Sequence, residues 1–146
     1  MVYYVTNTAY EALRSYIESA SEPSAALRGA RDHAEEYGLP VPDESTGQLL
    51  TTLTAASSGS TERPQSVAIT PAANVVGLYL LAGMPDNGIL TCIDHEAEHQ
   101  RSAKTAFREA GYRIYTRLLD SADYGVSQHR ERMFIVGLRE GEATYC

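Results

Sequence analysis

The pattern of apolar and polar residues divides the chain near residue 58 into two parts with different periodicities. In the first part, apolar residues recur every three to four positions, which predicts amphipathic helices. The predicted helices cover residues 9–20, 21–38 and 44–56. Ser21 and Asp43 stand where N-caps of the second and third helices are expected. Residues 57–64 are rich in serine and predict a flexible linker after this helical part, residues 1–58.

From residue 66 onward, short apolar runs alternate with longer helical patterns. The runs "SVAIT", "ILTCID", "YRIYTRLL" and "RMFIVGL" predict strands. "PAANVVGLYLLAG", with Thr70 as N-cap and Pro71 in first position, and "EAEHQRSAKTAFREAG" predict helices. Residues 66–112 are therefore expected to form a βαβα unit with parallel strands, and residues 113–139 an antiparallel hairpin. We expect one α/β domain across residues 1–146.

Composition and charge narrow the function classes. The chain is 43% hydrophobic and 21% charged, as is typical of globular proteins. Its longest apolar stretch, "VVGLYLLAGM", is too short to cross a membrane, and its first residues do not resemble a signal peptide. We therefore expect a cytoplasmic protein without a membrane partner and with reduced cysteines. The net charge of -7 argues against a dedicated nucleic-acid binder, although residues 113–139 hold five arginines against three acidic residues.

Candidate ligand-binding residues gather where two predicted parallel strands end, at the edge where such sheets bind nucleosides. The turn after the first strand leads directly into a helix, whose N-terminal amides favour an anionic or polar group. Asp94 ends the second strand 24 residues after Thr70, a spacing at which an acid binds a ribose. Asp94 is equally well interpreted as a helix cap. His95 and His99 are i, i+4 neighbours without an evident third ligand, so we expect no metal site.

Residues 24–112 resemble the small bacterial S-adenosylmethionine-dependent O-methyltransferases, the class related to catechol and caffeoyl-CoA methyltransferases. The resemblance rests on "ALRGARDHAEEYGLPVPDESTGQLLTTL", "SVAIT" and "VVGLYLLAGMPDNGILTCIDHEAEHQRSAKTAFREAGY". It implies S-adenosyl-L-methionine as cofactor and a small hydroxylated acceptor. Where that family has "E-x-G-T-x-x-G", this chain has "AITPAANVVG", with Thr70 and Asn74 at glycine positions. The implied cofactor-binding residues are Thr70, Pro71, Ala72, Gly77, Asp94 and His95.

Residues 111–139 resemble a conserved segment of DNA cytosine-5 methyltransferases, "GY-x-V-x-x-x-x-L-N-A-x-D-Y-G-V-P-Q-x-R-x-R-x-F-I-V-G". The matching stretch is "DYGVSQHRERMFIVG". The resemblance implies that Gln128 braces the loop and that Arg130 and Arg132 face a flipped cytosine and the catalytic loop, which makes these three the catalytic candidates. A planar guanidinium can donate two hydrogen bonds to a base. The Pro-Cys nucleophile and the Glu-Asn-Val motif of that family are absent.

These patterns predict a truncated Rossmann-like methyltransferase fold with N-terminal helices and a C-terminal antiparallel hairpin. A segment that resembles one methyltransferase class, residues 24–112, is followed by a C-terminal hairpin that resembles another, residues 111–139. The preferred function is methyl transfer from S-adenosyl-L-methionine to a small hydroxylated acceptor. One alternative is a fragment that binds cytosine or DNA through Arg130 and Arg132. The other is a non-catalytic α/β domain that self-associates, for example as a homodimer, because missing strands leave part of the sheet uncovered.

Overall fold

The computed structural model describes residues 7–20, 22–59 and 62–139, which alternate helices and strands largely as the sequence predicts. The helices are α1 (Asn7–Ala20), α2 (Ala25–Glu36), α3 (Glu44–Ser58), α4 (Ala73–Gly83), α5 (Ala97–Glu109) and the short 3-10 helix η1 (Ser121–Tyr124). The strands are β1 (Gln65–Ile69), β2 (Ile89–Asp94), β3 (Tyr112–Asp120) and β4 (Glu131–Arg139). The predicted α/β class is confirmed.

The four strands form one mixed sheet in the order β1-β2-β4-β3. β1 and β2 pair in parallel, as the βαβ pattern predicts, and β3 and β4 form the predicted antiparallel hairpin. β4 also pairs antiparallel with β2, so it lies between β2 and β3. β3 therefore runs in the same direction as β2 without pairing with it, and only one pair of strands is parallel. The arrangement is that of a truncated Rossmann-like fold.

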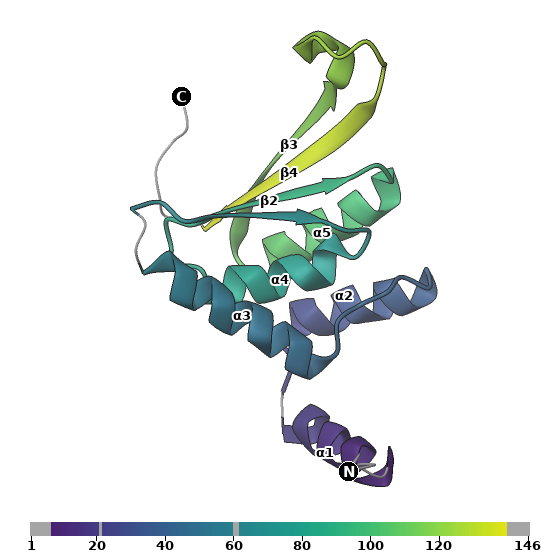
Figure 1. Ribbon diagram of the computed structural model, residues 1–146, viewed down its shortest axis with the longest axis vertical. Helices are drawn as coiled ribbons and strands as arrows, with labels where there is room; N and C mark the ends of the chain where they lie inside the picture. The colour runs from purple at the N-terminus through teal and green to yellow at the C-terminus, as the bar shows by residue number, and fades with distance from the viewer. Residues whose placement is uncertain (1–6, 21, 60–61, 140–146) are drawn as a thin grey trace, which may run out of the picture.

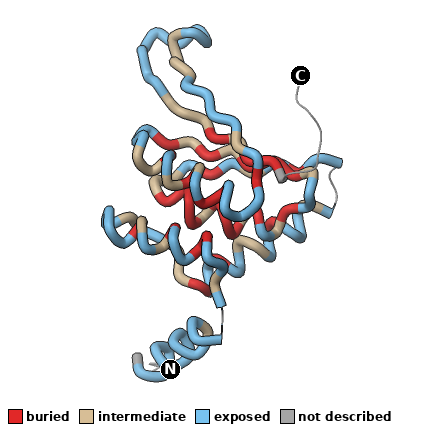
Figure 2. Tube along the Cα trace, turned by 180° about the vertical axis from the view of Figure 1, so that it is seen from behind, coloured by how far each residue is buried: buried red, intermediate tan, exposed pale blue. Residues whose placement is uncertain are grey.

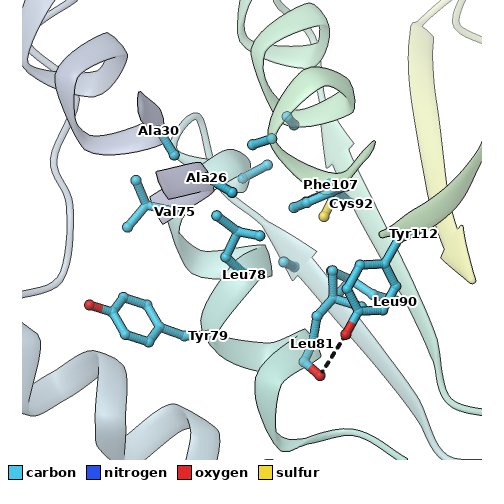
Figure 3. Close-up of a cluster of buried hydrophobic side chains, with 14 of the residues drawn as sticks. Ala26, Ala30, Val75, Leu78, Tyr79, Leu81, Leu90, Cys92, Phe107 and Tyr112 are labelled. Carbon is cyan, nitrogen blue, oxygen red and sulfur yellow. Dashed lines mark hydrogen bonds between the residues drawn. The ribbon is translucent and has the colours of Figure 1, made fainter. Parts of the chain in front are cut away.

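Helices α2 to α5 all lie on one side of the sheet (Figure 1). Alternate strand residues face this layer, and Ala68, Leu90, Cys92 and Ile135 join the buried core. Phe107 of α5 and Leu81 of α4 are among the largest fully buried side chains (Figure 3). The buried residues follow this interface along the chain (Figure 2). α4 and α5 pack directly on this face of the sheet, and α2 and α3 pack on these two helices.

We call the other face of the sheet the open face. The registers assign to it Gln65, Val67 and Ile69 of β1, Ile89, Thr91 and Ile93 of β2, Arg113, Tyr115, Arg117 and Leu119 of β3, and Arg132, Phe134, Val136 and Leu138 of β4. Val67 is 62% exposed and Ile69 is 77% exposed. No described helix lies over this face (Figure 1). A sheet of this kind usually carries helices on both faces, so half of the expected cover is absent from the described residues.

Two of the predicted helix caps differ from those observed. The predicted cap Ser21 lies outside the described residues, and α2 is capped instead by Ser24, whose Oγ accepts a hydrogen bond from the Leu27 amide at 3.2 Å. Thr70 is not the cap of α4, because its Oγ1 accepts from the Ala72 amide at 3.2 Å and the helix begins only after Ala72. The Thr70 hydroxyl instead closes a short turn over residues 70–72, and Ala72 takes the N-cap position without a side-chain hydrogen bond. The predicted cap Asp43 is confirmed.

α1 is the element with the least cover. Its side chains Tyr10, Leu13 and Tyr16 are all more than half exposed. It packs against the described part of the chain mainly through α3 and projects from the body in Figure 1. No described helix is both long enough and apolar enough to cross a membrane.

Candidate functional site

The sequence-predicted site residues lie at one end of the sheet, where β1 and β2 finish. Asp94, the last residue of β2, pairs with Met133 of β4, so Arg132 lies one position further toward the same end. The β1–α4 turn and the hairpin tip are at this end too. The faces differ, however: Asp94 belongs to the helix-covered face and Arg132 to the open face. The structure thus brings two neighbouring candidate sites to one edge.

Asp94 is buried and already makes several hydrogen bonds. Its Oδ1 accepts from the amide of His95 at 2.6 Å and, at 3.4 Å, from that of Glu96. Its Oδ2 lies 2.9 Å from Nδ1 of His99. The side chain is only 5% exposed. Asp94 is therefore not the N-cap of α5, a position that Glu96 holds without a side-chain hydrogen bond. Asp94 satisfies the two amides just before the helix and orients His99.

The histidines next to Asp94 do not form a metal centre with it in the described residues. The ring of His95 is largely exposed, with Nδ1 3.1 Å from Asp94 and Nε2 3.4 Å from Glu96. His99 is mostly buried and meets the ring of Tyr37 edge to face, with ring centroids 6.4 Å apart. No group of three or more His, Cys, Asp or Glu side chains in the described ranges could hold a metal ion.

The β1–α4 turn is packed rather than open. Ala72 is fully buried, and the Thr70 hydroxyl is engaged with the backbone of the turn. Asn74, at a position where the resembling O-methyltransferases have glycine, is 2% exposed. Its Nδ2 donates to the carbonyl of Ala30 at 3.1 Å and to Oγ of Ser102 at 2.9 Å. Asn74 therefore joins α4 to α2 and α5, and its side chain occupies the space that glycine would leave empty.

Gly77 is required by close packing between α4 and α5. A Cβ atom at this position would lie 2.3 Å from Cζ of Phe107 and 3.1 Å from Cδ2 of Leu90. Contacts this short do not occur between real side chains, so only glycine fits. The same role, close approach of a helix to its neighbours, belongs to the last glycine of nucleotide-binding turns. The packing of α4 against α5 therefore explains the glycine at position 77 without a bound ligand.

The residues at this edge fit the ribose end of a nucleoside cofactor. A carboxylate offers about four acceptor positions, and Asp94 uses three of them, one in a long contact. Nearby, Nε2 of Gln100 donates to the Asp94 carbonyl at 2.6 Å, while its buried Oε1 has no hydrogen-bond partner among the described residues. A buried acceptor without a partner favours a donor group such as a hydroxyl. The backbone of the β1–α4 turn, by contrast, is packed and does not offer free groups to a ligand in the same way.

The hairpin tip is organised by Asp120, a residue that sequence reasoning did not select. Its Oδ1 accepts from the amides of Ala122 at 3.1 Å and Arg130 at 3.0 Å, and its Oδ2 lies 2.8 Å from Nδ1 of His129. The His129 hydrogen bond and these amides lower the pKa of Asp120 to about 2. The same contact raises the pKa of His129. One carboxylate therefore holds both ends of the η1 loop together.

Beside this loop, the open face carries a cavity of about 300 Å³. Its lining residues are Leu119, Asp120, Ser121, Tyr124, Arg130, Arg132 and Phe134. The structure thus brings both predicted arginines together with two aromatic rings. Gln128 does not line the cavity; its main-chain carbonyl accepts from Oγ of Ser121 at 2.5 Å, which braces the loop. The alternation of side chains along β4 is enough to place Phe134 in the cavity wall. Tyr124 reaches the wall only because the η1 turn brings it there.

A buried polar network in the helical layer is a second feature without a sequence signal. Oη of Tyr79 donates to Oε2 of Glu44 at 2.6 Å and accepts from Nη2 of Arg31 at 2.7 Å. Burial, followed by the Glu44 hydrogen bond, raises the pKa of Tyr79. The three residues come from α4, α3 and α2. Their contacts pair the charge of Arg31 inside the helical layer.

Comparison with known proteins gives two separate similarities along the chain. A relative from Mycolicibacterium smegmatis, provisionally named an O-methyltransferase, is 39% identical over 101 residues, which are 69% of this chain and 46% of the relative. A relative from Mycobacterium ulcerans with the same provisional name is 41% identical over 102 residues, with 69% and 43% covered. Residues 90–145 match the family model of C-5 cytosine-specific DNA methylases.

A solved structure is similar to this chain in both sequence and fold. The crystal structure of a Corynebacterium glutamicum protein is 60% identical and superposes with a TM-score of 0.64. The match covers 72% of this chain and 48% of that protein. The chain therefore spans about half the length of the relatives that it matches.

Proposed function

Because the chain belongs to the class I S-adenosylmethionine-dependent methyltransferase superfamily, we propose that it transfers methyl groups from S-adenosylmethionine to a small hydroxylated acceptor. The observation that carries this proposal is the 39% identity over 101 residues to a relative provisionally named an O-methyltransferase. The parallel β1–α4–β2 unit, which ends at Asp94 beside the β1–α4 turn, also supports it.

In this proposal, the described residues act on the nucleoside part of the cofactor. Asp94 accepts hydrogen bonds from the ribose hydroxyls through its remaining acceptor position, and Gln100 Oε1 provides a second acceptor. Thr70, Pro71 and Ala72 form the neighbouring turn, and His95 stands exposed at the rim. When bound, S-adenosylmethionine supplies a methyl group on a positively charged sulfur. We expect S-adenosylmethionine to bind more weakly here than at a glycine-rich turn, because the backbone of the packed turn cannot approach the cofactor as closely.

The test is transfer of a labelled methyl group by the full chain. S-adenosylmethionine with a labelled methyl group is incubated with catechol in one reaction and with cytosine-containing DNA in another. The proposal expects label on the hydroxylated acceptor, and loss of that transfer in Asp94→Asn but not in Glu98→Gln, an equal charge change on the following helix, α5. Label on neither acceptor at high protein concentration would contradict methyltransferase activity.

The cavity at the hairpin tip favours a second candidate, recognition of cytosine in DNA. Arg130 and Arg132 offer guanidinium donors beside Tyr124 and Phe134, which suits a planar base. The methylation chemistry has no candidate nucleophile in the described residues, since burial raises the pKa of the Cys92 thiol to about 12. This candidate is therefore a binding activity. Equal affinity of the wild-type protein and Arg132→Ala for cytosine-containing DNA would contradict it.

A further inference from the structure

The open face has a charge distribution that its position in a sheet does not explain. None of its strand residues is acidic, and three of them are arginines: Arg113, Arg117 and Arg132. The whole chain has a net charge of -7. Although the protein is acidic, none of the strand residues that point to this face has a carboxylate. Such a face attracts an anionic partner.

The arginines of this face have no charged partners within the described ranges. Arg113 and Arg117 are exposed and form no ion pair there, and Arg132 donates only to the neighbouring main-chain carbonyl of Glu131. By contrast, Arg14, Arg31 and Arg101 on the helices each pair with a glutamate. Three guanidinium groups on one face are thus free to bind phosphate groups, which they contact through two parallel hydrogen bonds.

Two aromatic rings lie among these arginines. Tyr115 of β3 is 43% exposed and pairs with Val136, and Phe134 of β4 pairs with Arg117. Tyr115 and Phe134 are therefore diagonal neighbours on one face, a separation of about 7–8 Å between backbones. Arg113 and Arg117 flank Tyr115 at about 6–7 Å along the strand. Sheets that present aromatic rings between basic residues stack two or three unpaired bases.

We propose that the open face binds an unpaired nucleic-acid strand, with its phosphates at Arg113, Arg117 and Arg132 and its bases stacked on Tyr115 and Phe134. A second copy of the chain is a poorer occupant. If two open faces met around a twofold axis, all six arginines would be buried without a carboxylate on either strand surface. A duplex fits less well than a single strand because its bases are already stacked and paired. The proposal does not rest on methyl transfer, and it differs from cytosine recognition because stacking tolerates any base.

The test is fluorescence anisotropy of a labelled 15-residue oligothymidylate titrated with the full chain at several salt concentrations. Three phosphate contacts predict that the logarithm of affinity falls with the logarithm of salt concentration with a slope of about -2. Arg117→Gln should reduce the steepness of that slope by about 0.7. Tyr115→Leu keeps the face apolar but removes the ring, and should weaken binding about tenfold at an unchanged slope. Arg101→Gln, an equal charge change on α5, should leave affinity and slope unchanged.

Three results would overturn the proposal. The first is no saturable binding at 50 mM salt, roughly where phosphate contacts are strong. The second is an equal loss of affinity in Arg101→Gln and Arg117→Gln, which would show an effect of net charge only. The third is a dimer in sedimentation that Ile69→Lys dissociates, together with no oligonucleotide binding, which would assign the open face to a second copy. Binding of oligothymidylate without any binding of S-adenosylmethionine would support the inference while contradicting the proposed methyltransferase function.

Discussion

The two faces of the sheet are built from alternate residues of the same four strands, yet they differ in almost every respect. On β1, Ala68 is 6% exposed beneath the helices, whereas its neighbours Val67 and Ile69 are 62% and 77% exposed. The larger apolar side chains of this strand therefore point away from the core. The comparison teaches that the buried face is chosen by where the helices cross, not by which side chains are most apolar.

The helices and the open face also differ in how their arginines are paired. Arg14, Arg31 and Arg101 on the helices are each paired with a glutamate, and Arg31 is also bonded to Tyr79 in a buried network. Those on β3 and β4 of the open face have no such partners in the described chain. The helices therefore hold paired arginines and the apolar core. The arginines and the apolar side chains of the open face lack such partners in the described residues, which is why we propose that this face binds a partner.

The largest expected effect contrasts one core side chain with one side chain of the open face. Phe107 is fully buried between α4, α5 and the sheet, so Phe107→Ala should lower the free energy of unfolding by about 3–5 kcal/mol. Ile69→Ala removes a side chain that is largely in solvent and should change it by less than about 0.5 kcal/mol. Urea unfolding measures both. An equal loss in the two variants would show that the open face is covered in solution.

A smaller effect is expected from adding one methyl group at two helical glycines. Gly77→Ala places Cβ against the ring of Phe107 and should destabilise the fold by about 1–3 kcal/mol. Gly29→Ala meets no atom within 4 Å on the exposed side of α2 and should stabilise by roughly 0.5–1 kcal/mol, because alanine favours helix. Thermal unfolding of both variants checks the opposite signs. Stabilisation by Gly77→Ala would mean that α4 and α5 are further apart than described.

The smallest expected effect is local and depends on pH at the hairpin tip. The pKa of Asp120 is about 2, below its ordinary 3.8, so its contribution to loop order is complete above about pH 4 and is lost as the pH falls through 2. The pKa of His129 is raised above 6.5, so its contribution is present below that pH and is lost as the pH rises through the raised value. The loop should therefore be best ordered between about pH 4 and 6.5.

The measurement for this loop is the NMR shift of the Ala122 and Arg130 amide protons, which donate to Asp120. Their titration should have an acidic midpoint near 2 and should vanish in Asp120→Asn. A midpoint near 4 would show that the carboxylate is free in solution and that the tip is not organised by it.

The succession of elements was predictable from the sequence because local signals decide it. Apolar periodicity gives the helices and strands, and the absence of a helical pattern between β3 and β4 gives the hairpin. The caps were less predictable: serines at positions 21 and 24 are both plausible in sequence, and only the actual start of α2 selects Ser24. The insertion of β4 between β2 and β3 depends on pairing between distant segments, which periodicity does not encode.

The candidate site was predictable in its residue types but not in its contacts. Asp94, Arg130 and Arg132 were selected from sequence, and the structure brings them to one end of the sheet. That Asp94 is shared with His99, and that Asn74 fills the turn, depends on packing of α2 and α5 around α4. Asp120 carries no signal in the sequence, because its role depends on the folded loop that brings the Ala122 and Arg130 amides to its carboxylate.

The most direct test of the central claim is a calorimetric titration of the full chain with S-adenosylmethionine and S-adenosylhomocysteine. The claim is that Asp94 at the end of β2 holds the ribose of this cofactor. The wild-type protein should bind at micromolar strength, Asp94→Asn should bind at least about tenfold more weakly because a charge-assisted hydrogen bond is lost, and Glu98→Gln should match the wild type. No heat at millimolar ligand, or equal binding by Asp94→Asn, would contradict it.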